Sequence, residues 1–247
     1  MRNLKSVTQL FITLFAVLNT ACSSSPSDAN IIESNPEMAT AAVVLPILMD
    51  ISTSTVPVIN VPDSTELIEL YEIVGQHPAS TISLGNIGYT VSSDKEFLRF
   101  DKLKIPLKNV NSGTMSQRKN SMDFNSKAKY INQQKQHDFI KSFDAISKRD
   151  NEQTDITTAL ERSIRFLKEP NFSHHKKILL IISDGYQVTK GIREFNSDFS
   201  ALPDLQIILV GWKNNTSGFK NIDANQISIF ESFKNVPYYI STLINPQ

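Results

Sequence analysis

The sequence predicts an α/β protein with a mostly parallel central sheet, one antiparallel edge strand and helices on both faces. Three mostly aliphatic runs lie far apart in the 247-residue chain, at 43–49, 178–183 and 205–210. Such runs are typical of parallel strands that are covered on both sides. Segments with helical periodicity lie between them, and this alternation indicates strands joined by helical crossovers.

The first strand and the first helix are the clearest elements of the N-terminal half. Pro46 lies inside the run 43–49 and cannot donate to a sheet ladder, so we expect pairing to begin there. Asp63 and Glu66 have the spacing of a capping box at a helix N-terminus. The apolar residues that follow at helical spacing, before Gly75, are Leu67, Leu70, Tyr71 and Val74.

The middle of the chain predicts a hairpin, a loop and a helix. Residues 80–91 and 97–105 read as two strands, joined by the polar turn 92–96. Residues 107–125 are polar and lack periodicity, so we expect a loop there. The next helix is expected at 126–147. Its apolar residues are Ile131, Phe139, Phe143 and Ile146.

The C-terminal part alternates again, although with weaker signals. A helix is expected at 156–167, and Pro170 lies just beyond its end. After the strand 178–183, residues 192–199 predict at best a weak helix. Beyond the strand 205–210, residues 230–233 predict a helix and residues 238–240 an edge strand.

The N-terminal 21 residues predict a signal peptide, with two basic residues before the apolar stretch 7–18. That stretch is too short to cross a bilayer as a stable anchor. It runs into Cys22, the only cysteine, and resembles the lipobox of bacterial lipoproteins, although Asn19 stands where an aliphatic residue is usual. The resemblance implies that Cys22 is lipidated. An ordinary cleaved signal peptide with a chance cysteine is the alternative.

The segment after the cysteine predicts a tether that leads to a single domain. Residues 22–41 are rich in Ser, Asn, Pro and Ala, as in flexible linkers. By resemblance to lipoprotein sorting, Ser23 favours the outer membrane of a Gram-negative cell, with the protein facing the periplasm or the surface. Residues 42–247 then form one domain of ordinary size.

The charge gives no argument for nucleic acid as a partner. The formal net charge is zero, whereas a nucleic-acid-binding domain is typically strongly basic. Basic residues are nevertheless concentrated between Lys95 and Lys141. We interpret them as a solvated face rather than as a dedicated anion site.

Oxygen donors follow two of the predicted buried strands. Asp50, Ser52 and Ser54 place one carboxylate and two hydroxyls two residues apart, directly after the first strand. Asp184 follows a second aliphatic strand, and Thr154 stands at the start of a predicted helix. Because ligands in an open α/β sheet bind beyond the carboxyl ends of the strands, we expect these groups to meet at one edge.

Together, these elements resemble the metal-ion-dependent adhesion site (MIDAS) of von Willebrand factor type A (VWA) domains. That family combines a DxSxS loop, a threonine before the third helix and an aspartate after the fourth strand, and all three are present in order. The resemblance spans about residues 43–244 and implies a Rossmann-like VWA fold. The metal ligands that it implies are Asp50, Ser52, Ser54, Thr154 and Asp184.

The resemblance also implies a metal and a kind of partner. Hard oxygen donors favour Mg²⁺, with Mn²⁺ and Ca²⁺ as competitors. In the family, an acidic residue of a protein partner takes the open position on the metal. Candidates for the rim around this contact are Val58, Ile59, Asp94 and Trp212. The sequence leaves open whether the segment that contains Val58 and Ile59 faces a partner or covers the core. The same question is open for Trp212.

An enzymatic function is the principal alternative to adhesion. A strand-end aspartate with Mg²⁺ also begins haloacid-dehalogenase chemistry, which needs a second aspartate two residues later as general acid. That position is Ser52. We therefore predict a non-enzymatic adhesion or assembly module, with a phosphoryl hydrolase and a structural envelope subunit with a vestigial site as alternatives.

Overall fold

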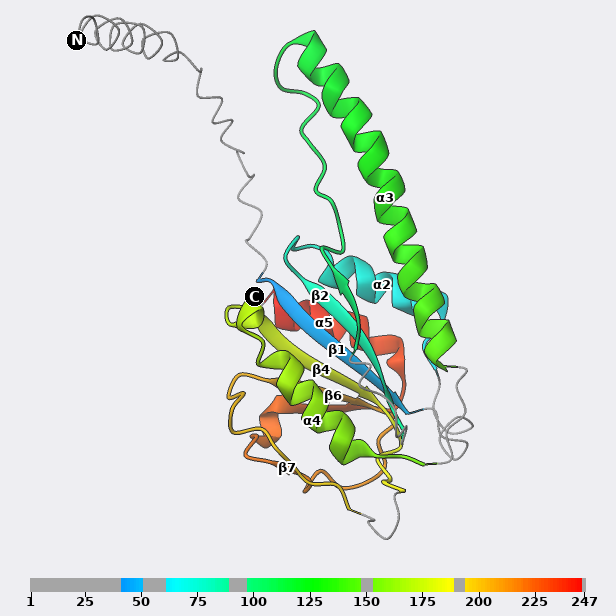
Figure 1. Ribbon diagram of the computed structural model, residues 1–247, viewed down its shortest axis with the longest axis vertical. Coiled ribbons are helices and arrows are strands. Elements are labelled where there is room, and N and C mark those ends of the chain that lie inside the picture. The colour runs from blue at the N-terminus through cyan, green and yellow to red at the C-terminus, as the bar shows by residue number, and fades with distance from the viewer. Residues whose placement is uncertain (1–40, 51–60, 89–96, 148–152, 189–193, 246–247) are drawn as a thin grey trace, which may run out of the picture. The chain divides into compact units, whose positions relative to one another are not determined.

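The computed structural model describes residues 41–50, 61–88, 97–147, 153–188 and 194–245. Six strands form one sheet in the order β3-β2-β1-β4-β6-β8 (Figure 1). Every neighbouring pair is parallel except β2 and β3, so the predicted fold class is confirmed. The strands are β1 (Val43–Asp50), β2 (Thr81–Ile87), β3 (Leu98–Asp101), β4 (Lys176–Ile182), β6 (Gln206–Val210) and β8 (Ile227–Phe230).

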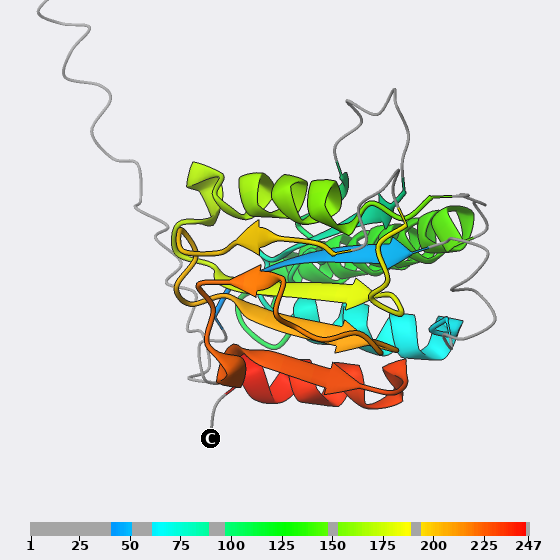
Figure 2. The ribbon, with the colours of Figure 1, turned by 90° about the horizontal axis from the view of Figure 1, so that it is seen from below.

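Helices cover both faces of this sheet (Figure 2). α2 (Ser64–Val74), α3 (Met115–Ser147) and α5 (Val236–Ile244) pack on one face, and α4 (Ile156–Leu167) packs on the other. Successive residues of a strand point to opposite faces. In β1, Val43, Leu45, Ile47 and Met49 accordingly join the first core, and Val44 and Leu48 join the second.

Short elements complete the chain on the α4 side and at the C-terminus. β5 (Ser197–Asp198) and β7 (Phe219–Lys220) form a separate two-stranded sheet. Phe199 and Phe219 from this region belong to the α4-side core. The single-turn 3-10 helices are η1 (Pro170–Phe172), η2 (Ala224–Gln226) and η3 (Phe233–Asn235).

The elements with a strong local signal form as expected. Asp63 caps α2 through a complete capping box with Glu66, and the four predicted core residues of this helix are all buried. α4 has the predicted bounds. The prediction for Pro46 was wrong, because β1 pairs with β2 from Val44 onward, and Pro46 itself is aligned with Ser83. On the β4 side, pairing is interrupted at this point, between Val44 and Ile47.

The predicted loop at 107–125 was wrong from residue 115 onward, where α3 begins. Thr114 and Gln117 form reciprocal hydrogen bonds at this end, from Thr114 N to Gln117 Oε1 over 2.7 Å and from Gln117 N to Thr114 Oγ1 over 3.4 Å. This T-x-x-Q capping pattern was the missed signal. The first half of α3 has no buried apolar stripe because it does not pack on the sheet, and Ile131, an apolar residue of the predicted helix, is exposed.

Two predictions for the C-terminal part were wrong, because a strand lies where a helix was expected and a helix lies where a strand was expected. Residues 227–230 pair with β6 as β8, so the helix predicted at 230–233 is instead a strand end followed by η3. The predicted edge strand at 238–240 lies inside α5. Pro237 is favourable in the first turn of a helix, and Val236, Ile240 and Ile244 bury one helical stripe. Residues 194–199 contain β5 rather than the weak helix predicted at 192–199.

Within the described ranges, no helix has the length and apolar character that crossing a membrane requires. The longest of the described helices, α3, is polar along most of its length. The predicted signal peptide, Cys22 and the tether lie outside the described residues.

Candidate metal centre

Two carboxylates meet where the order of the strands reverses. From β1 the chain passes outward to β2 and β3, and it then returns to β4 on the other side of β1. Such a switch point is where open α/β sheets bind ligands. Met49 is aligned with Ile182 across these two parallel strands. Asp50 and Asp184, which follow, therefore lie at the same edge, and they are only 4% and 7% exposed.

Thr154 reaches this edge from the start of α4. Its backbone pairs with Val188, through Thr154 N to Val188 O over 3.2 Å and Val188 N to Thr154 O over 3.0 Å. The threonine is buried, and its Oγ1 donates to Asp50 Oδ1 over 3.4 Å. Three predicted ligands that lie far apart in the sequence are thus brought together.

Ser183 is a member of this cluster that the sequence analysis missed. Its Oγ donates to Asp50 Oδ2 over 2.9 Å and accepts a hydrogen bond from Gly185 N over 3.0 Å. Ser183 therefore holds one carboxylate oxygen in place and also ties the turn after β4 to β1. Its position directly before Asp184 was visible in the sequence, but its contact depends on the pairing of β1 with β4.

Asp184 is positioned mainly by backbone groups. Its Oδ1 accepts from Tyr186 N over 3.0 Å, and its carbonyl oxygen accepts from Lys213 N over 2.9 Å. Burial and the nearby negative charge of Asp50 raise the pKa of the Asp184 carboxyl, against opposing contributions that include the hydrogen bond from Tyr186. No ion pair to Asp184 is present within the described part of the chain.

This donor set fits a hard divalent cation. Two buried carboxylates supply the negative charge, and a hydroxyl of Thr154 lies beside one of them. Oxygen donors of this kind suit Mg²⁺ better than the softer metals that prefer sulfur or nitrogen. The described ranges contain no cluster of three or more His, Cys, Asp or Glu residues arranged to hold a metal. The hydroxyls are therefore an essential part of the proposed shell.

The remaining predicted positions fall into two groups. Ser52 and Ser54 lie outside the described residues, as do the candidate rim residues Val58, Ile59 and Asp94. Trp212 is described and is buried. Of the two interpretations that the sequence left open for Trp212, the structure shows the core position.

Trp212 supports the turn that carries Asp184. Its ring packs at 5.5 Å between centroids against both Phe195 and Phe219. Gly185 lies against the same ring at φ +82°, where a Cβ atom would come within 2.6 Å of Trp212 Cε2. The absence of a side chain at Gly185 thus allows the turn after β4 to approach the indole closely.

Two apolar side chains beside the carboxylates are exposed. Tyr186 and Val188 are each about half exposed, on the segment between Asp184 and the bridge to Thr154. Between them, Gln187 is buried, and its Oε1 accepts from Thr157 N over 3.2 Å and from Thr157 Oγ1 over 2.9 Å. Gln187 therefore fixes the segment to α4, and its two neighbours point outward. The sequence signal was an aromatic and an aliphatic residue directly after the Asp-Gly turn.

The fold and the site define a Rossmann-like α/β domain with an acidic centre at its switch point. No protein-family model matches the chain, and the comparison with curated proteins finds no relative. Among solved structures, the chain is similar to proximal thread matrix protein 1 from the mussel byssus, in a structure with a zinc-occupied MIDAS motif. The sequence identity is 14% and the TM-score is 0.40, over 83% of this chain and 46% of that one.

A second crystal form of that byssus protein matches at 12% identity and a TM-score of 0.37, over 83% of this chain and 48% of that one. A von Willebrand factor type A structure from Catenulispora acidiphila matches at 10% identity and a TM-score of 0.35, over 83% of this chain and 42% of that one. The chain thus spans less than half the length of these three solved chains.

Proposed function

We propose that this chain is a VWA-type binding module that holds a divalent cation at the switch point and grips a protein partner through it. One observation carries the proposal. Asp50, Thr154 and Asp184, which the sequence pattern assigned to one metal site, converge from three separate segments at one buried edge of the sheet.

The ligand set defines what each residue does in this proposal. Asp50 and Asp184 offset the charge of the cation, whereas Thr154, Ser52 and Ser54 supply neutral hydroxyl oxygens. Such a shell suits Mg²⁺, with Mn²⁺ and Ca²⁺ as competitors. With two carboxylates, the bound ion keeps electrophilic character, so that an Asp or Glu of a partner can complete its coordination.

The partner surface includes the exposed pair Tyr186 and Val188. Both flank the proposed metal on a segment that Gln187 fixes to α4. Tyrosine is one of the residue types that are enriched among the residues that dominate binding at the centre of protein interfaces. We infer that the partner presents its acidic residue next to an apolar side chain. We also infer that the module is not an enzyme, because Ser52 stands where haloacid-dehalogenase chemistry needs an aspartate as general acid.

The anchor is proposed from the N-terminal sequence. Lipidation at Cys22, followed by the tether 22–41, would attach the domain stably to a membrane. Ser23 favours the outer membrane of a Gram-negative envelope as the location.

Metal binding is tested by calorimetric titration of Mg²⁺ and Mn²⁺ into the wild-type chain and into Asp50→Ala. Asp198→Ala is the matched control, because Asp198 is an exposed carboxylate on β5, away from the switch point. We expect saturable binding to the wild type and the control, and its loss in Asp50→Ala. Equal binding by all three proteins would refute the assigned site.

Partner binding is tested separately by capture from the envelope fraction of the source cells, in Mg²⁺ and in EDTA. Partners held through the metal are released by EDTA and are not captured by Asp50→Ala. Capture that is unaffected by EDTA contradicts the adhesion mechanism, even where the titration detects a bound ion.

A further inference from the structure

The first half of α3 forms an arm beyond the amino edge of the sheet (Figure 1). β3 ends at Asp101, which is aligned with Thr81, and Thr81 is aligned with Val44 near the start of β1. The chain then runs outward over residues 102–113 and returns along α3. We call residues 102–132 the basic arm. Its helical part, residues 115–132, is about 25 Å long at 1.5 Å per residue.

Side-chain to backbone hydrogen bonds hold the two sides of the arm together. Asn125 pairs with both backbone groups of Lys108, at 2.8 and 2.9 Å. Asn132 does the same for Ile105, at 2.7 and 3.0 Å. Near the tip, Arg118 Nε donates to Gly113 O over 3.1 Å. These contacts occupy one side of the helix and leave the other side open.

Positive charge outweighs negative charge on the arm. The sequence from 107 to 132 contains a single acidic residue, Asp123, in a chain whose formal net charge is zero. Lys108 lies over the ring of Phe124, with Nζ 4.5 Å from the ring centroid. The basic residues in the same span are Lys108, Arg118, Lys119, Lys127 and Lys129.

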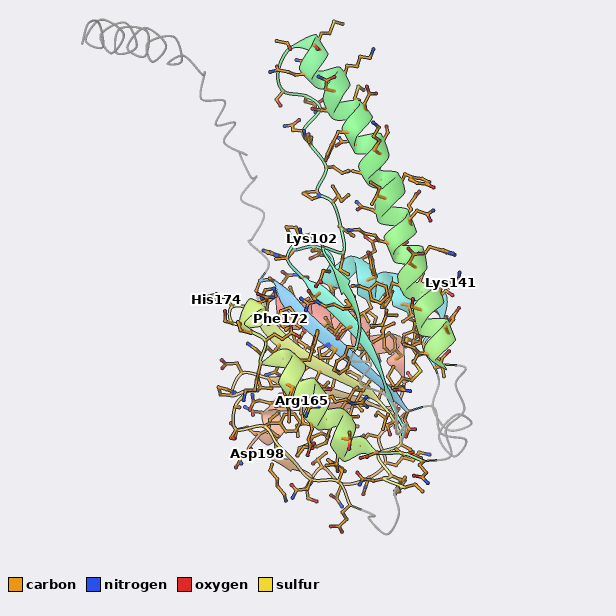
Figure 3. All side chains as sticks on the ribbon, in the orientation of Figure 1. Lys102, Lys141, Arg165, Phe172, His174 and Asp198 are labelled. Atoms are coloured by element: carbon orange, nitrogen blue, oxygen red, sulfur yellow. The ribbon has the colours of Figure 1, made fainter. Side chains whose placement is uncertain are left out.

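The open side of the arm also carries large apolar side chains. Met115, Met122 and Tyr130 are 90%, 59% and 64% exposed. Their spacing of seven and fifteen residues from the first places them on one side of a helix. The same spacing rule puts two basic residues beside them, and Figure 3 shows that this half of α3 projects beyond the sheet with side chains all around it. These two residues are Lys119 and Lys129.

We propose that this stripe lies on a membrane surface and binds anionic lipid headgroups. Basic residues that flank Met and an aromatic on one helix side are typical of helices that rest in the headgroup region. The convex, projecting stripe fits a plane, and the arm leaves the sheet at the edge where β1 begins, opposite Asp50. A membrane contact there keeps the proposed metal site open to a partner. The proposal depends neither on the metal nor on Cys22.

The test uses the full chain with Cys22→Ser, so that no lipid anchor contributes, and vesicles of phosphatidylcholine with or without phosphatidylglycerol. We expect more of the protein to float with vesicles that contain phosphatidylglycerol than with vesicles of phosphatidylcholine alone. Added salt is expected to reduce this binding. Replacing Lys119 and Lys129 by Glu lowers the partition coefficient by at least roughly 25-fold, since each basic residue near an anionic surface contributes about fivefold.

A matched charge control reverses two exposed lysines elsewhere, in Lys220→Glu and Lys234→Glu. If the arm makes the contact with the vesicle, this control protein retains most of the vesicle binding. Replacing Met115, Met122 and Tyr130 by Ser weakens binding at every salt concentration. An equal loss of vesicle binding in the charge control overturns the proposal. Binding without a preference for phosphatidylglycerol also overturns it, and is the result expected if the arm instead binds an acidic protein. Unchanged binding by the Ser variant also overturns it, because the contact is then charge adsorption alone.

Discussion

Ser183 donates a hydrogen bond to Asp50 over 2.9 Å and thereby joins the ends of β4 and β1 at the centre of the proposed metal site. The serine is fully buried, and its oxygen also accepts from Gly185 N. One side chain thus orients a predicted ligand and holds the turn that carries the second one, Asp184. The geometry of the two carboxylates depends on a residue that is not itself among the predicted ligands.

Replacing Ser183 by Ala is expected to weaken Mg²⁺ and Mn²⁺ binding by about 10-fold or more, the usual effect of losing a group that orients a metal ligand. Titration calorimetry measures the change. Ser163→Ala is the control, since Ser163 is equally buried but, among the described residues, its hydroxyl bonds only to Ala159 O within α4. Equal affinities for the two variants would show that Asp50 does not need this support.

Asp184→Asn is expected to stabilise the metal-free protein and to abolish its stabilisation by Mg²⁺. The variant removes a buried negative charge next to Asp50, while its side-chain oxygen can still accept from Tyr186 N. Each 1 kcal/mol gained would raise the Tm by about 2–4 °C for a domain of this size. Thermal unfolding in EDTA and in Mg²⁺ measures both effects, with the exposed Asp204→Asn as control. A lower Tm in EDTA contradicts the electrostatic argument.

Gly185→Ala is expected to destabilise the protein by more than about 2 kcal/mol, because an L residue is strained at this positive φ and its Cβ meets Trp212. Urea unfolding measures the loss. The same substitution in a Trp212→Ala background separates the two causes, since only the clash is relieved there. If the cost is identical in both backgrounds, the backbone conformation alone accounts for it.

Asp101→Asn is expected to lower stability at neutral pH but not in acid. Burial by itself would raise the pKa of Asp101, but hydrogen bonds from Arg99 and Thr81 outweigh it and lower the pKa. The ionised form therefore stabilises the fold above the unfolded pKa of about 3.9, and this contribution is lost as the pH falls through the folded value.

The size of this effect is limited by exposure to solvent. An ion pair at the surface contributes less than about 1 kcal/mol. Urea unfolding of wild type and Asp101→Asn at neutral pH and near pH 3 checks the sign, with Asp144→Asn, an exposed carboxylate on α3, as control. A difference that grows in acid contradicts it.

Local signals were sufficient for much of the fold. The capping box at Asp63, the helical stripe of α4 and the aliphatic runs of β1, β4 and β6 led to the right elements, because each signal acts within a few residues. The oxygen donors at the ends of β1 and β4 could be assigned to one edge, since parallel strands end together.

The predictions for other elements were wrong because tertiary contacts decide the secondary structure of these segments. Ile227 and Ile229 become a strand by pairing with β6, and Tyr238 lies in a helix because α5 packs on the sheet. The first half of α3 has no core to face, so it has no buried apolar stripe by which its sequence could indicate a helix. Asn125 and Asn132 bond to a segment that runs alongside them.

The sequence by itself determined the fold class and three described members of the proposed site, Asp50, Thr154 and Asp184, because strand ends and helix starts are local features. Only the tertiary structure decided how these residues are held and what surrounds them. The pairing of β1 with β4 brings Ser183 to Asp50, the packing of the turn buries Trp212, and the bridge to Thr154 exposes Val188. These contacts join residues far apart in the chain, so no local pattern encodes them.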